Sequence, residues 1–167
     1  QRVPVVWEPT VAASLVNAVA MAASGDAYFR RNTFLSDLED NLIASSNLRI
    51  VDDATLPTRL GSRPFDAEGV RTRCTSLIDD GVFKGFLFDT YNARRTGRSS
   101  TGSAVRGVGS LPMVGSGNLV VEPGQESPEK IIGGLSNGLY LTSLMGFGTN
   151  IVTGDFSRGA SGLWIRD

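Results

Sequence analysis

Residues 70–88 read VRTRCTSLIDDGVFKGFLF, and this stretch predicts the β-hairpin on which the fold is built. Two runs suited to strands flank Asp80-Gly81, a dipeptide that accepts the positive φ angles of a tight hairpin turn. The second run, from Val82 to Phe88, carries enough apolar bulk for a strand in the hydrophobic core. We therefore expect antiparallel pairing to dominate the strands of this protein.

Short helices and strands alternate on both sides of the hairpin. An alanine-rich run with an apolar stripe predicts a helix over residues 10–24, with Pro9 in its first turn and Gly25 just past its end. Further helices are expected over residues 89–97 and 127–135. Strands are expected over residues 3–7, 48–51, 118–121 and 139–144 and, as a pair bent at glycines, 151–166. The pattern indicates an α+β fold of mainly antiparallel β-sheets with a few packed helices, in a single domain over residues 1–167.

The chain contains no histidine, and this absence removes several mechanisms. Histidine is the usual general base near neutral pH, the usual partner of a serine or cysteine nucleophile, and the commonest metal ligand. A Ser-His-Asp triad and a His-containing zinc site are therefore excluded within this polypeptide. Chance or codon bias could also explain the missing residue type.

Charge and cysteine content narrow the class of partner. The net charge is −1, and the basic residues form no run typical of nucleic-acid or membrane binding. The densest basic group, Arg94, Arg95, Arg98 and Arg106, could contact phosphate or the carboxylates of a partner. The single cysteine, Cys74, allows no internal disulfide, which fits a reducing cytoplasmic location, and we expect it to be buried or half-buried.

Two further motifs leave alternatives open. Asp66 and Glu68 could form a divalent-cation site, or they could belong to a turn before the hairpin, solvated or paired with arginine. Residues 99–117 form a Gly/Ser-rich stretch without a convincing helix or strand, and a loop of that length is functional, partner-bound or disordered.

Several segments together resemble the TldD/PmbA family of peptidase-related proteins, known also as modulators of DNA gyrase. They occur in family order and are spread over residues 61–165: GSRPFDAEGVRT (61–72), LFDTYNARR (87–95), SSTGSA (99–104), NLVVEPG (118–124) and TGDFSRGASGLWI (153–165). The resemblance implies a fragment of the family's C-terminal domain, without the family's N-terminal domain and last strands.

The resemblance also implies which of two subunit types this is. TldD-like subunits carry HExxxH on the helix near the start of this domain, where zinc is bound and the glutamate acts as general base. PmbA-like (TldE) subunits lack that motif and pair with the first type in a heterodimer. The corresponding positions here are Val16, Asn17 and Met21, so we expect no metal and no catalytic residue in this chain.

The resulting hypothesis is a non-metal-binding subunit that processes unfolded peptides with a zinc-bearing TldD-like partner. The candidates for its peptide channel or subunit interface are Arg94, Arg95, Ser100, Thr101, Gly102, Asp155 and Ser157. An alternative is a peptidase-inactive homodimer that acts as an adaptor and binds another protein. A weaker one is an independent hydrolase using Asp66, Glu68 or Cys74 with a metal.

Overall fold

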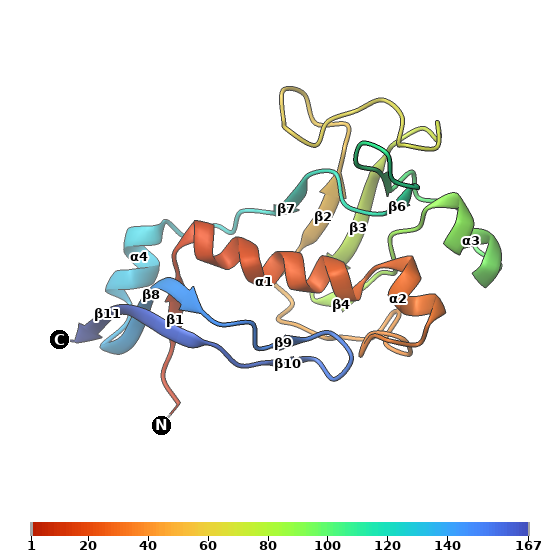
Figure 1. The fold of residues 1–167 in the computed structure, drawn as a ribbon. Coiled ribbons are helices and arrows are strands. Elements are labelled where there is room, and N and C mark those ends of the chain that lie inside the picture. Colours follow the sequence, from red (N-terminus) through yellow and green to blue (C-terminus); the bar gives the residue numbers. More distant parts are fainter. Residues whose placement is uncertain (1, 167) are drawn as a thin grey trace.

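A long helix lies between two β-sheets in the computed structural model, which describes residues 2–166 (Figure 1). Helix α1 (Pro9–Ala22) contacts β7 of a four-stranded sheet on one side and β8 of a three-stranded sheet on the other. All strand pairs within the sheets are antiparallel except β1 with β8. The predicted α+β fold with mainly antiparallel sheets is confirmed.

The sequence around α1 explains both of its ends. The side chain of Glu8 accepts a hydrogen bond from the Thr10 backbone N–H (3.1 Å), and Pro9 stands where its missing N–H costs nothing. The prediction that Gly25 ends this helix is wrong, because Gly25 begins a second helix, α2 (Gly25–Phe29). A Cβ at Gly25 would lie 2.3 Å from the Phe88 ring, so glycine is required here for close packing.

The four-stranded sheet has the order β4-β3-β2-β7 and contains the predicted hairpin. Its strands are β2 (Ile50–Asp53), β3 (Cys74–Asp79), β4 (Val82–Phe83) and β7 (Leu119–Val121). Asp80 and Gly81 both have positive φ angles, 48° and 78°, as a tight hairpin turn requires. Cys74 is exposed, contrary to expectation, because it opens β3 before that strand reaches the core at Leu77.

The three-stranded sheet has the order β1-β8-β11. Its strands are β1 (Val5–Trp7), β8 (Asn137–Met145) and β11 (Gly159–Arg166). Helix α4 (Pro128–Gly133) precedes β8 in the chain. Between β8 and β11 the hairpin continues as β9 (Thr149–Asn150) and β10 (Asp155–Phe156). The predicted strand pair within residues 151–166 is therefore wrong: residues 151–154 form the turn between β9 and β10, and β11 pairs with β8.

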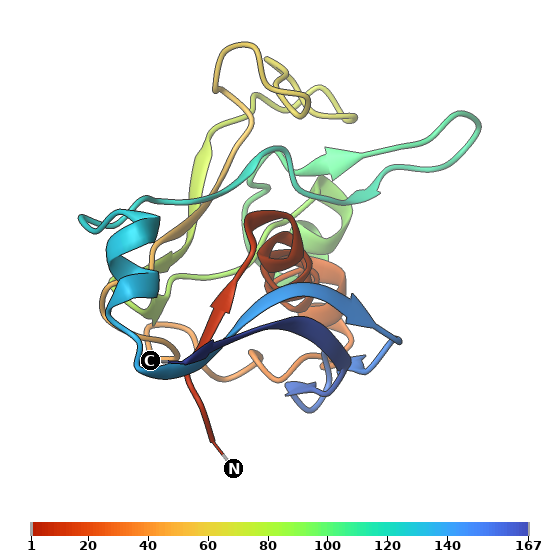
Figure 2. The ribbon, with the colours of Figure 1, turned by 90° about the vertical axis from the view of Figure 1, so that its left-hand side faces the viewer.

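The Gly/Ser-rich stretch 99–117 holds two short strands that the sequence did not predict. Strands β5 (Ala104–Val105) and β6 (Met113–Val114) form an arm that projects from the body of the molecule in Figure 2. Val108 and Leu111 near its tip are almost fully exposed. Each strand has only two residues, which is too short for alternation to be recognised in the sequence.

The hydrophobic core lies around the four-stranded sheet, α2 and α3 (Thr90–Thr96). Phe83 and Leu77 are completely buried there, and the Phe83 and Phe86 rings meet edge to face with their centroids 5.0 Å apart. Asp66 is also buried, so the expectation that it is solvated or paired with arginine is wrong. Its carboxylate accepts hydrogen bonds from the backbone N–H groups of Glu68, Val70 and Ala104. This carboxylate orders the turn before the hairpin. Across residues 2–166, no helix combines the length and the apolar character needed to cross a membrane.

Candidate functional site

The face of α1 that carries Asn17 and Met21 borders a small cavity. Asn17 and Met21, one helical turn apart, are exposed and line this cavity of ≈ 250 Å³. Its opposite wall comes from Leu87 and from the residues that follow the arm, Val114, Gly115 and Ser116. Val16 does not line it, because this side chain packs against the hydrophobic core. We call this cavity the α1 cavity.

The residues of the α1 cavity are chemically neutral. Its polar side chains are the Asn17 amide and the Ser116 hydroxyl, beside the Met21 thioether and apolar neighbours. Zinc sites use thiolate, imidazole or carboxylate ligands, so valine, asparagine and methionine do not fit that ion. Elsewhere in residues 2–166 there is no group of three or more Asp, Glu or Cys side chains placed to hold a metal ion. The polar side chains of the α1 cavity can form hydrogen bonds with a ligand such as a peptide, and its apolar side chains can pack against that ligand.

Glycine shapes the approach of the arm to this cavity. A Cβ on Gly115 would lie 2.4 Å from a methyl carbon of Val105, across the β5–β6 pair. The arm therefore meets the cavity wall only because residue 115 has no side chain. Sequence reasoning pointed to the glycine-rich stretch as a whole but missed Leu87, since an apolar residue in a predicted core strand carries no signal for a cavity wall.

Ser100, Thr101 and Gly102 anchor the chain after α3 onto the core, where the first two contact Phe88 in the segment after β4. The Thr101 hydroxyl accepts a hydrogen bond from the Phe88 N–H (2.8 Å), and the Ser100 hydroxyl donates to the Phe88 carbonyl (3.1 Å). Gly102 is buried with φ of +74°, and a Cβ there would lie 2.6 Å from the Arg71 carbonyl oxygen. The polar atoms of these residues are engaged within the chain, so their direct contribution is to position this segment.

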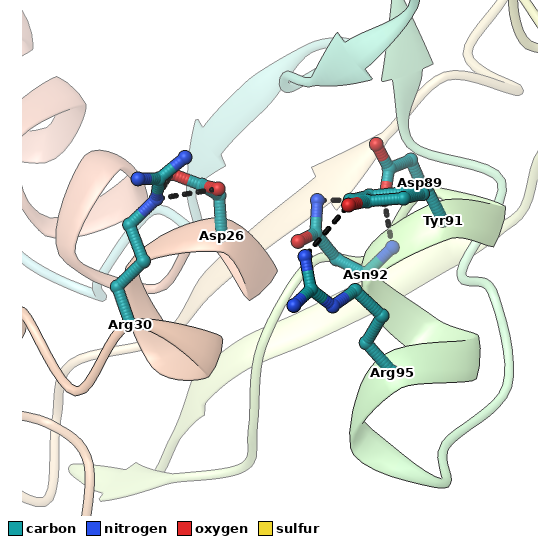
Figure 3. Close-up of polar contacts among 6 residues, drawn as sticks. All are labelled: Asp26, Arg30, Asp89, Tyr91, Asn92 and Arg95. Carbon is teal, nitrogen blue, oxygen red and sulfur yellow. Dashed lines mark hydrogen bonds and ion pairs between the residues drawn. The ribbon is translucent and has the colours of Figure 1, made fainter.

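The two arginines proposed as interface residues lie on α3. Arg94 is exposed, whereas Arg95 stacks over the Phe29 ring at 3.9 Å and donates a hydrogen bond to the Tyr91 hydroxyl (2.6 Å; Figure 3). Asp89 caps the helix by accepting from the Asn92 backbone N–H (2.8 Å; Figure 3). Arg95 thus joins α3 to α2, and Arg94 presents a cation to solvent.

Asp155 and Ser157 lie apart from the other candidates. Both are exposed, and the Asp155 carboxylate accepts a hydrogen bond from the Thr153 hydroxyl (2.7 Å). In Figure 1, strand β10, which carries Asp155, lies below α1, whereas α3 lies to the right, beyond α2. The structure therefore distributes the predicted residues over α3, the anchor after it and the β9–β10 hairpin, and does not gather them into one site.

The pKa values of Arg98 and Cys74, which both lie outside the α1 cavity, are shifted. Arg98 donates to both carboxylate oxygens of Glu39, and this pairing raises the pKa of the arginine, as does its contact with the Tyr28 hydroxyl. Partial loss of solvation around the Cys74 sulfur raises the pKa of that thiol, and the nearby carboxylate of Asp53 raises it further. A raised thiol pKa lowers the fraction of reactive thiolate at neutral pH, which argues against Cys74 as a nucleophile.

Comparison with known proteins identifies the family. The sequence profile of the PmbA/TldA metallopeptidase C-terminal domain matches residues 1–167. Metalloprotease PmbA of Escherichia coli O157:H7 is 36% identical over 166 residues, which cover 99% of this chain and 35% of that relative. The chain thus spans about a third of the length of the curated relatives it matches.

Solved structures agree with that match. TldE from Thermococcus kodakarensis superposes with a TM-score of 0.80 at 34% identity, covering 87% of this chain and 33% of that one. A protein of Bacteroides thetaiotaomicron, named as a proposed modulator of DNA gyrase, gives a TM-score of 0.84 at 33% identity, covering 97% and 35%. From the profile, the relatives and the shared fold we conclude that this chain belongs to the TldD/PmbA family and corresponds to its C-terminal domain.

Proposed function

We propose that this chain is the metal-free subunit of a TldD/PmbA-type peptidase. In this proposal it assembles with a zinc-bearing TldD-like subunit, and the pair processes unfolded or extended peptides in the cytoplasm. The observation that carries the proposal is the pair Asn17 and Met21, which border the α1 cavity at positions where a TldD-like subunit has glutamate and histidine. A neutral cavity at that position can contact a peptide without hydrolysing it.

Backbone pairing offers a second contact for an extended peptide. Within residues 2–166, strand β11 has a neighbour, β8, on one side only, so its other edge presents backbone groups that are unpaired in this part of the chain. An extended chain can add to such an edge through main-chain hydrogen bonds, without any requirement for a particular sequence. This mode of binding suits a substrate class defined by its lack of structure.

Co-expression tests the proposal. The protein is produced alone and together with a family member that carries HExxxH. Size-exclusion chromatography with light scattering then gives the composition of the complex, and elemental analysis gives its zinc content. We expect zinc-dependent cleavage of an unfolded peptide only in the complex, and no stoichiometric zinc in the isolated chain. Stoichiometric zinc in the isolated chain contradicts the proposal. A stable homodimer that forms no complex with the zinc-bearing protein contradicts it as well.

A matched pair of variants tests the cavity itself. Met21→Arg fills the mouth of the α1 cavity with a long cation, whereas Ala13→Arg places the same side chain at an exposed position of α1 that does not line it. We expect Met21→Arg to lower the cleavage rate of the complex at least about tenfold, comparable to losing one or two good contacts. Ala13→Arg should leave the rate unchanged. Equal rates for the two variants would show that peptides do not use the cavity.

A further inference from the structure

A second, larger cleft lies in the segment that connects the end of β2 to the start of β3. It has a volume of ≈ 430 Å³ and is formed by the loop after β2 and by the turn that leads into β3. We call it the Arg63 cleft, after a residue whose role the sequence did not suggest. Its lining residues include Leu56, Pro57, Arg63, Pro64, Phe65 and Arg71.

The turn that carries this cleft is well ordered by hydrogen bonds. Phe65 and Arg71 face each other as an isolated antiparallel bridge, and the buried Asp66 carboxylate accepts from the backbone N–H groups of Glu68 and Val70 between them. The backbone of Arg63 is held on both sides, since its N–H donates to the Ala54 carbonyl (2.9 Å) and its carbonyl accepts from the Thr72 hydroxyl. The side chains of the cleft therefore stand on a fixed frame.

The cleft has positive charge without a matching negative one. Both Arg63 and Arg71 line it, and no aspartate or glutamate does. Neither arginine forms an ion pair with a carboxylate of residues 2–166. Burial raises the pKa of the nearby Asp52 and the charge of Arg63 opposes this rise, but no hydrogen bond joins the two side chains. The Asp52 carboxylate accepts a hydrogen bond from the Gly117 backbone N–H instead (2.7 Å).

The guanidinium of Arg63 has unused hydrogen-bond donors. Its Nε and Nη2 atoms are buried and have no acceptor among residues 2–166, and Nη1 has only a 3.5 Å contact there, with the Gly61 carbonyl oxygen. Buried donors of a charged group are nearly always satisfied, because leaving them unpaired is energetically costly. Because both arginines line the cleft without an acidic partner, its charge favours an anion as the ligand.

The remaining walls of the cleft are apolar. Leu56, Pro57, Pro64 and Phe65 surround the two arginines, and the Phe65 side chain is 57% exposed although it is aromatic. A free inorganic anion would pair with the arginines but would leave the apolar walls of the cleft exposed to water. A carboxylate attached to an apolar side chain uses both, and guanidinium groups match the planar geometry of a carboxylate.

We propose that the Arg63 cleft binds the C-terminal carboxylate of a peptide whose last side chain is apolar. The carboxylate lies between Arg63 and Arg71, and the apolar side chain packs on Phe65 and the prolines. This inference rests on the proposed function to the extent that peptides are the ligands. It assigns the subunit a specific task, which is to hold the free end of a peptide away from the α1 cavity.

Binding measurements on the protein alone test this inference. Isothermal titration compares acetyl-Ala-Ala-Phe as the free acid with the same peptide as its C-terminal amide, and inorganic phosphate is the third probe. We expect the free acid to bind at least about tenfold more tightly than the amide, as expected for losing one charge-assisted hydrogen-bonded contact. Equal affinity of acid and amide overturns the proposal, and so does phosphate binding as tightly as the free acid.

Variants locate the binding. Arg71→Gln, at an exposed position, should weaken binding of the free acid at least about tenfold. Arg106→Gln removes an exposed arginine that lies outside the cleft, on the arm, and should bind like the unaltered protein. The affinity of Arg63→Gln is compared only if its circular dichroism spectrum matches that of the unaltered protein. If the spectrum differs, the affinity of Arg71→Gln alone tests the proposal. An unaltered affinity in Arg71→Gln overturns the proposal.

The outcome is separable from that of the co-expression test. Neither zinc nor a second subunit takes part in the titration, so carboxylate binding can succeed even if no complex with a TldD-like protein forms. Conversely, a zinc-dependent complex that cleaves peptides, together with equal binding of acid and amide, would retain the proposed function and remove the Arg63 cleft from it.

Discussion

The two larger sheets of this protein, the four-stranded and the three-stranded one, differ in how deeply their apolar residues are buried. Around the four-stranded sheet, Leu77, Ile78 and Phe83 are at most 2% exposed. In the three-stranded sheet, Leu163 and Trp164 of β11 are 67% and 56% exposed, and Leu141 is its one buried apolar residue among residues 2–166. An apolar run in the sequence therefore predicts a strand, but the burial of that strand depends on which elements pack against it.

The largest contrast is expected from truncating one aromatic residue in each sheet. Phe83→Ala removes a completely buried ring and should lower the free energy of unfolding by about 3–5 kcal/mol. Trp164→Ala removes a ring that is mostly in water and should cost less than about 1 kcal/mol. Urea unfolding followed by circular dichroism measures both. Similar losses would mean that the exposed sheet is covered in solution.

A buried and an exposed carboxylate extend the comparison to polar groups. Asp66→Ala leaves three backbone N–H groups without their acceptor and should cost about 2–4 kcal/mol. Asp155→Ala, on the exposed β9–β10 hairpin, loses only a contact with the Thr153 hydroxyl and should change stability by less than about 0.5 kcal/mol. Thermal unfolding of the two variants checks this difference. A small effect at Asp66 would contradict its role in ordering the turn.

Two glycines provide a test of packing density. Gly25→Ala places a methyl group 2.3 Å from the Phe88 ring and should destabilise the protein by about 1–3 kcal/mol. Gly133→Ala, at the end of α4, meets no atom within 4 Å and should be neutral or stabilising by up to about 1 kcal/mol. Denaturant midpoints compare them directly. A tolerated alanine at residue 25 would show that α2 can move away from the core strand.

The smallest effect concerns a carboxyl group in the four-stranded sheet. Burial raises the pKa of Asp52, although the Gly117 N–H and the charge of Arg63 oppose the rise. A raised pKa means that stability from this group is present at low pH and is lost as the pH rises through the folded-state value. Relative to Asp52→Asn, the unaltered protein should therefore gain stability between pH 7 and pH 4, by less than about 1 kcal/mol. Melting temperatures at the two pH values measure the difference, and a constant gap between the two proteins would contradict it.

Local signals predicted the parts of the fold that depend on local chemistry. Asp80-Gly81 forms the expected turn, and Glu8-Pro9 begins α1, because turn and cap preferences act over a few residues. Gly25 was misread as a helix end because its requirement comes from Phe88, which is distant in sequence. The burial of Asp66 likewise depends on Ala104, which no local pattern connects to it.

The candidate site divides in the same way. Family resemblance located Asn17 and Met21, and these residues border a cavity. Nothing local distinguishes Arg63 from the other arginines, since its lack of hydrogen-bond partners is a property of the folded chain. Arg94, Asp155 and Ser157 were grouped by sequence but lie on separate elements, because motif order along a chain does not fix distance in space.

The parallel pairing of β1 with β8 has a consequence for the order of folding. It joins Val5, Val6 and Trp7 to Leu139, Tyr140 and Leu141, and so closes a loop of nearly the whole chain. Closing so long a loop is entropically unfavourable and slow, whereas the hairpin at Asp80-Gly81 closes a short one. On the ribosome, β1 is made well before β8, and its apolar residues remain without their partner strand throughout synthesis of the intervening residues. Strand β1 is thus translated long before it can take its place in the sheet.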